Sequence, residues 1–161
     1  MSVNPEELKS VMSRVAATVT VVTANSEEGP IGFTVSSFVS VSADPPIVLF
    51  GADKATTEEL PILEAKGFTV NVMPKGTEDV AWVFASEGVD RFGSTPWQAA
   101  TTPDAGPVLE SALAHLECTT IERAEFGDHW VLYGEVTAAA VADEIVAPLV
   151  WLGGGFVDIV E

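Results

Sequence analysis

The sequence predicts a mainly β protein whose strands form a small antiparallel barrel with a few short helices attached. Three observations predict this fold class: segments rich in β-branched residues alternate apolar and polar positions, turn residues separate them, and stretches with a helical period are short. With 161 residues, 47% of them apolar and 19% charged, the chain can bury one core. A single domain covering 1–161 is therefore expected.

The chain begins with a predicted amphipathic helix. Asn4 suits the N-cap, Pro5 suits the first helical position, and Glu7 lies at the capping-box spacing. One face of this segment would carry four apolar residues: Leu8, Val11, Met12 and Val15.

Three strands are expected next, over 18–24, 31–42 and 47–52, with a turn at 25–30 and a Pro45-Pro46 break before the third. In 31–42, one face carries Phe33, Val35, Val39 and Val41, and the other carries Thr34, Ser36, Ser40 and Ser42. No charged residue occurs between 29 and 43. The row of hydroxyls has two interpretations, a solvent-facing strand surface or the wall of a site for a polar ligand edge.

The remainder continues the mainly β pattern. Thr57 is expected to cap a short helix that Gly67 ends, followed by a strand over 68–73 and a second short helix over 77–86. Residues 86–107 show no period, which predicts a long surface loop. Two strands, 112–124 and 130–142, are joined by a turn at 125–129, and an apolar segment, 147–160, closes the sequence.

Charge and composition exclude several classes of function. A net charge of −17 repels nucleic acid and anionic membranes, so neither is expected as a partner. No window reaches the roughly 18 apolar residues of a membrane span, and the first ten residues do not resemble a signal peptide. Cys118 is the single cysteine, which suits a reducing compartment. A soluble cytoplasmic protein is expected.

Familiar catalytic motifs are missing from the sequence. It contains no G-x-x-x-x-G-K-[ST] loop, no G-x-G-x-x-G turn and no G-x-S-x-G elbow. His115 and His129 are the only histidines, and neither has metal-ligand spacing to Cys118, so no metal site is expected.

Three polar segments remain as candidates, each with a structural alternative. Lys54, Thr56 and Thr57 could bind a phosphate at a helix start or form an ordinary capped helix. His129 could contact a ligand or simply terminate a strand. Arg91, in the long loop, could bind a phosphate or pair with a neighbouring acid.

Taken in order, several segments resemble the short-chain flavin reductases, which have an FMN-binding split β-barrel fold of the antiparallel Greek-key type. The resemblance runs from about Met12 to Phe156. It rests on the following segments: "MSRVAATVTVVT", "GFTVSSFVSVSADPP", "FTVNV", "DRFG", "GPVLESALAHLEC", "GDH" followed by "GEV", and "PLVWLGGGF". The sequence departs from the family pattern at Thr18, Gly153 and Phe156.

The resemblance implies a set of cofactor-binding residues. Those expected at the flavin ring, ribityl chain, phosphate or flavin tail are Thr34, Val35, Ser36, Ser37, Asp53, Lys54, Ala55, Thr56, Thr57, Asn71, Phe84, Ala85 and Arg91. His129 is expected on the nicotinamide side, where it would position that ring.

The implied activity is that of an NAD(P)H:flavin oxidoreductase that moves a hydride from nicotinamide C4 to flavin N5. The resemblance implies FMN or FAD as the flavin and NADH or NADPH as co-substrate. It also implies a homodimer and a separate monooxygenase that takes the reduced flavin. Two alternatives stay open: a flavin-bound oxidoreductase with another donor or acceptor, and a non-enzymatic carrier of flavin or haem.

Overall fold

The computed structural model describes residues 2–57, 61–144 and 146–159. Its helices are α1 (Pro5–Met12), α2 (Lys54–Thr57), the 3₁₀ turn η1 (Pro61–Leu63) and α3 (Glu78–Ala85). Its strands are β1 (Ala17–Thr18), β2 (Thr20–Ser26), β3 (Gly29–Val35), β4 (Val39–Ala43), β5 (Pro46–Asp53), β6 (Gly67–Val72), β7 (Trp97–Gln98), β8 (Val108–Leu109), β9 (Ala114–Phe126), β10 (His129–Val141), β11 (Val150–Leu152) and β12 (Gly155–Val157). The prediction of a mainly β, antiparallel fold is confirmed.

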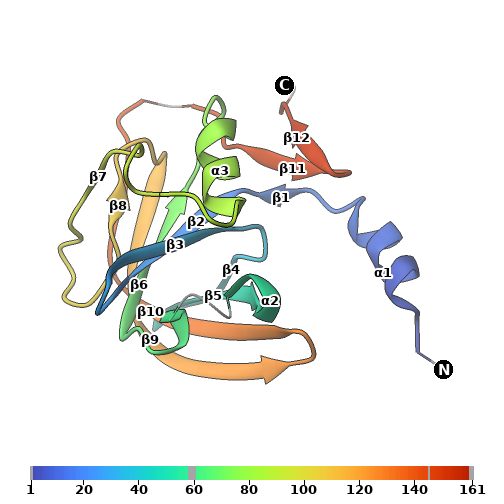
Figure 1. Ribbon diagram of the computed structural model, residues 1–161, viewed down its shortest axis with the longest axis horizontal. Coiled ribbons are helices and arrows are strands. Elements are labelled where there is room, and N and C mark those ends of the chain that lie inside the picture. Colours follow the sequence, from blue (N-terminus) through green and yellow to red (C-terminus); the bar gives the residue numbers. More distant parts are fainter. Residues whose placement is uncertain (1, 58–60, 145, 160–161) are drawn as a thin grey trace.

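The main sheet has seven strands in the order β3-β2-β6-β9-β10-β5-β4, and every neighbouring pair is antiparallel. Its two edge strands, β3 and β4, follow each other in the sequence and are joined only by residues 36–38. Because the four residue steps from Val35 to Val39 span at most about 14 Å, the sheet must curl until its edges lie close together. The result is a barrel that is split between β3 and β4 (Figure 1).

The expectation of one continuous strand over 31–42 is wrong. The strand breaks after Val35, because the chain leaves one sheet edge there and joins the other. The alternation does not continue across the break: Phe33 and Val35 are buried, whereas Val39 and Val41 are each 50% exposed. Ser37 lies in the connection, where its hydroxyl donates to Gly51 O and accepts from Gly51 N, at 2.9 and 3.0 Å.

Two apolar clusters flank the sheet. The barrel interior is built around Phe33, Phe50 and Phe68, whose rings pack at centroid distances of 6.0 and 5.0 Å. A second cluster lies under α3 and includes the buried side chains of Ala81 and Phe84. Strand β2 is buried on both faces from Thr20 to Ala24 because it separates the two clusters.

The helices differ in how they join this body. The capping box at Asn4 and Glu7 is confirmed, yet α1 contains no buried residue and extends away from the barrel (Figure 1). The helix expected from Thr57 to Gly67 is corrected: Thr57 ends α2 instead of capping it, and Gly67 begins β6. Residues 58–60 of that expectation lie outside the described residues.

The long hairpin of β9 and β10 confirms the turn expected near 125–129. It turns at Gly127, whose φ of +57° is a conformation that glycine adopts without strain. The long loop expected over 86–107 contains a single strand, the two-residue β7. This loop is held to β9 by the buried carboxylate of Glu117.

Candidate functional site

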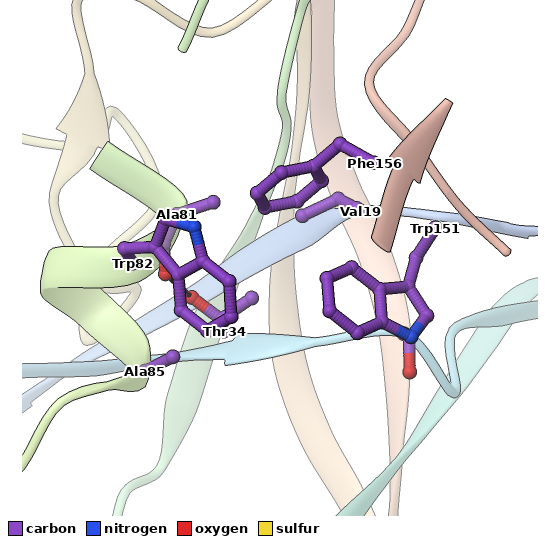
Figure 2. A pocket seen from close by; sticks show the side chains of 8 residues that line it. Val19, Thr34, Ala81, Trp82, Ala85, Trp151 and Phe156 are labelled. Carbon is purple, nitrogen blue, oxygen red and sulfur yellow. Dashed lines mark hydrogen bonds between the residues drawn. The ribbon is translucent and has the colours of Figure 1, made fainter. Parts of the chain in front are cut away.

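An aromatic slot of about 180 Å³ opens beside the barrel split. Figure 2 shows Trp82 of α3 facing Trp151 of β11, with Phe156 of β12 at their side. The three rings meet edge to face, with centroids 5.1 to 5.8 Å apart. The remaining lining residues are Val19, Thr34, Ser36, Ala81 and Ala85.

A wider groove of about 1,030 Å³ adjoins the slot. It lies between the N-terminal segment from Lys9 to Thr18, the connection 36–38 and the hairpin turn of β11 and β12. Ser36 and Trp151 line both the slot and the groove, so the two cavities are neighbours. Together they provide an apolar aromatic surface next to a polar rim.

The hydroxyl row beside these cavities is not uniform. Thr34 Oγ1 donates a hydrogen bond to Ala81 O at 2.6 Å, which ties β3 to α3. The Ser37 hydroxyl is already hydrogen-bonded to the backbone of Gly51. Ser36 is exposed, and its side chain makes no hydrogen bond within the described residues. Of the three hydroxyls, that of Ser36 is therefore the one most available to a ligand.

His129 lies near this polar rim, at the start of β10. A Cβ atom placed on Gly51 would lie 3.0 Å from Ser37 Oγ and 3.6 Å from His129 Cδ2. The side chains of Ser37 and His129 therefore both lie against Gly51 of β5. The imidazole Nδ1 is 2.8 Å from Asp128 Oδ1. The hydrogen bond with His129 lowers the pKa of the Asp128 carboxyl below its usual range.

The segment from Asp53 to Thr57 follows β5 and contacts the turn of the β9–β10 hairpin. Lys54 Nζ forms an ion pair with the Glu125 carboxylate and donates to Gly127 O at 2.7 Å. The Ala55 backbone N–H donates to Asp53 Oδ1 at 2.8 Å. Thr56 is exposed. The cation expected to bind a phosphate therefore already has a carboxylate partner.

Arg91 lines a separate cavity of about 180 Å³ against the first half of β3, with Ile31 and Gly32. Its Nη2 donates to Ser86 O at 2.7 Å, whereas its buried Nε has no partner within the described residues. Burial lowers the pKa of the guanidinium, and the negative charge of Glu87 acts in the opposite direction.

Three of the expected residues do not offer a side chain to a ligand. Asn71 is fully buried: Nδ2 donates to Val21 O at 3.1 Å and Oδ1 accepts from Leu109 N at 2.8 Å. Val35 and Phe84 belong to the two apolar clusters. Ala85, in contrast, is exposed at the slot. The amide of Asn71 therefore holds strands together.

The ring residues Trp82 and Trp151 were not among the residues expected at the site. A signal for Trp82 was present in the helical period, because Ala81 and Phe84 form the buried face of α3 and leave Trp82 on the other face. Trp82 is 54% exposed and packs with Trp151 and Phe156, and an exposed patch of aromatic side chains commonly marks a binding surface. For Trp151 no such signal exists, since β11 is only three residues long.

Two features are absent from the described residues. No group of three or more His, Cys, Asp or Glu side chains in 2–57, 61–144 and 146–159 could hold a metal ion. Over the same ranges, no helix is both long enough and apolar enough to cross a bilayer.

Comparison with known proteins matches residues 12–159 to the flavin reductase-like domain family. The FMN reductase (NADH) of Agrobacterium fabrum is 35% identical over 153 residues, 95% of this chain and 85% of that protein. The reductase subunit of a flavin-dependent monooxygenase from Mycobacterium tuberculosis is 29% identical over 158 residues, 98% of this chain and 83% of that protein. The structure of an NADH:FAD oxidoreductase from Streptomyces globisporus is 34% identical with a TM-score of 0.88, covering 99% of this chain and 97% of the other.

Proposed function

The chain belongs to the flavin reductase-like domain family, and from this premise we propose that it is an NAD(P)H:flavin oxidoreductase that supplies reduced flavin to a separate monooxygenase. The observation that carries the proposal is the row of cavities along β3. Arg91 and Ile31 line a cavity at the start of the strand, and the aromatic slot and groove meet at Ser36 just beyond its end. Five residues of extended chain span about 17 Å, which is comparable with the length of a flavin mononucleotide.

The residues along this row suit the parts of a flavin. The slot offers aromatic and apolar walls, and the exposed Ser36 hydroxyl offers a hydrogen bond to the polar edge of a ring. The buried Nε of Arg91 has no partner within the described residues, and a phosphate would satisfy it. Lys54 and Thr56 are proposed to lie near the same tail.

The protein's share of the reaction is binding and orientation. When bound, the flavin supplies the acceptor for the nicotinamide hydride, so no side chain has to act as the redox centre. The aromatic rings are proposed to shield a flavin bound in the slot from water, and His129, at the rim next to Ser37, is proposed to position the nicotinamide. We also propose a cytoplasmic location; Cys118, whose pKa burial raises to about 12, would be inert there.

The proposed activity is tested by anaerobic reduction of flavin. The purified protein is mixed with FMN or FAD, NADH or NADPH is added in separate cuvettes, and flavin absorbance and nicotinamide loss are followed together. Protein-dependent loss of the flavin absorbance is expected with at least one pair. If the protein binds flavin but reduces it with neither nicotinamide, the hydride donor is a different compound. If it binds no flavin, the proposed function is incorrect.

Replacing His129 by alanine is expected to raise the KM for NAD(P)H about tenfold, the effect of losing one hydrogen bond to a bound ligand. The Kd of the flavin should change less than about threefold, because His129 is placed on the nicotinamide side. Steady-state kinetics and flavin fluorescence titration measure the two constants. The control is Asp128→Asn, which keeps the imidazole and should have the smaller effect on KM. A larger effect of His129→Ala on flavin binding than on KM would contradict this role.

We propose that two copies of the chain form the working unit. The first support is the N-terminal segment, where Leu8, Val11 and Met12 of α1 are 53 to 62% exposed and Val15 is 51% exposed. The second is the edge strand β4, where Val39 and Val41 remain open. The wide groove has α1 on one side and Val39 on the other, so a second copy seated on these surfaces would enclose it.

Introducing a charge on β4 is expected to break this homodimer. Val41→Glu should shift the molar mass measured by size-exclusion chromatography with light scattering from two chains to one, because a carboxylate is costly to bury in an interface. Val141→Glu changes a residue that is 76% exposed at the end of β10 and serves as the control. A monomeric wild type, or an unchanged dimer in Val41→Glu, would be evidence against the proposed interface.

A further inference from the structure

The ammonium group of Lys54 is already engaged on several sides. It forms an ion pair with Glu125, donates to Gly127 O at 2.7 Å, and lies 5.5 Å from the centroid of the Trp130 ring. Two of its three N–H donors are therefore used, and its charge is balanced by a carboxylate. The Lys54 backbone N–H also donates to Asp128 O at 3.0 Å, which fixes the residue to the hairpin turn.

We infer that Glu125 is an internal competitor for the flavin phosphate: the phosphate reaches Lys54 only by displacing the Glu125 carboxylate. This inference rests on the proposed function, because it takes Lys54 as a partner of the flavin tail. It adds a residue, Glu125 of β9, that contacts Lys54 and that the sequence analysis did not connect with the site.

Glu125 is the partner of Lys54 that can leave. Its side chain is 58% exposed, whereas the Gly127 carbonyl is part of the hairpin backbone and the Trp130 ring is only partly exposed. Water can solvate the released carboxylate, so the exchange does not bury an unpaired charge. An ion pair as exposed as this one changes an equilibrium constant by at most about fivefold, so Glu125 weakens phosphate binding without preventing it.

The competition has a consequence for how flavin is used. The chain has seven Lys and Arg against 24 Asp and Glu, so each cation near the site contributes a large share of the attraction for a phosphate. A carboxylate that re-forms its ion pair with Lys54 offsets part of the cost of losing the phosphate. Glu125 therefore favours release of reduced flavin, which suits a flavin that is exchanged as a substrate over one that is held permanently.

The test compares two flavins and two variants of the full chain. FMN and riboflavin, which lacks the phosphate, are titrated into wild type, Glu125→Gln and Glu122→Gln, and Kd is measured from flavin fluorescence. Glu122 is the matched control because it is exposed on the same strand and contacts its neighbour's backbone, Arg123 N, instead of Lys54. Both variants change the net charge by one unit, so their difference isolates the release of Lys54.

Glu125→Gln is expected to bind FMN about threefold to fivefold more tightly than wild type. Its Kd for riboflavin, and the Kd of Glu122→Gln for FMN, should equal the wild-type values. Combining Glu125→Gln with Lys54→Met should remove the gain. An equal gain in Glu122→Gln, or an equal gain for riboflavin, would overturn the assignment, since neither depends on Lys54 meeting a phosphate. If FMN is bound and reduced normally but the two Gln variants are alike, only the role of Glu125 fails. If neither the wild type nor any variant binds FMN or FAD, the proposed function fails as well.

Discussion

Replacing Glu117 by alanine is expected to lower the free energy of unfolding by about 3 to 5 kcal/mol. The carboxylate is 2% exposed and accepts three hydrogen bonds: from Thr101 N at 3.1 Å, Thr101 Oγ1 at 2.9 Å and Thr102 N at 2.6 Å. Its removal leaves these donors without an acceptor and detaches the loop over 86–107 from β9. Urea unfolding followed by circular dichroism measures the change.

The control for this prediction is Glu122→Ala on the exposed side of the same strand, for which a loss below about 0.5 kcal/mol is expected. A loss of similar size in both variants would mean that strand propensity, and not the buried carboxylate, causes the effect.

The same carboxylate makes stability depend on pH. Burial by itself would raise the pKa of Glu117, but the hydrogen bonds from Thr101 and Thr102 outweigh it and lower the pKa below the ordinary 4.5. The folded protein therefore binds this proton less readily than the unfolded chain. The stabilisation is fully present above about pH 4.5 and is lost as the pH falls through the lower pKa of the folded state. The stability difference between wild type and Glu117→Gln should accordingly shrink as the pH falls below about 5.

Replacing Asn71 by leucine is expected to cost about 2 to 4 kcal/mol of stability while leaving the Kd for FMN within about twofold of wild type. The side chain is fully buried, and its loss would leave Leu109 N and Val21 O without their present partner. Thermal or urea unfolding measures the loss of stability. Flavin titration under conditions where the variant is still folded measures the Kd for FMN.

Asn25→Ala is the matched control. Asn25 Nδ2 also donates a hydrogen bond to a backbone carbonyl, Ala105 O of the loop over 86–107, but Asn25 is exposed. A loss below about 1 kcal/mol is expected there. If Asn71→Leu instead abolished flavin binding with little change in stability, Asn71 would belong to the ligand surface after all.

Much of the fold follows from local patterns in the sequence. The capping box at Asn4 and Glu7, the turn at Gly127 and the alternation in β3 depend on neighbouring residues only, so they were predicted correctly. The resemblance of ordered segments also identified the family, because the motifs extend over nearly the whole chain and the family match covers residues 12–159.

The candidate site could be predicted only in part, because the sequence shows which groups are polar but not which are already bonded. The hydroxyls of Thr34 and Ser37 donate hydrogen bonds to Ala81 O and Gly51 O, and the amide of Asn71 donates to Val21 O of a neighbouring strand. Each of these partners is at least 14 residues away in the chain. No local pattern contains such a contact.

The sequence by itself determined the class of fold and most of the strands, which depend on residue order over short spans, and the family, whose motifs follow one another along nearly the whole chain. Tertiary structure alone decided that the chain breaks at 36–38 to close the barrel, that Trp82 meets Trp151 and Phe156, and that Lys54 meets Glu125. The physical reason is the same in each case. These contacts form when the curled sheet and the long β9–β10 hairpin bring distant segments together, and their geometry depends on the register of the whole sheet.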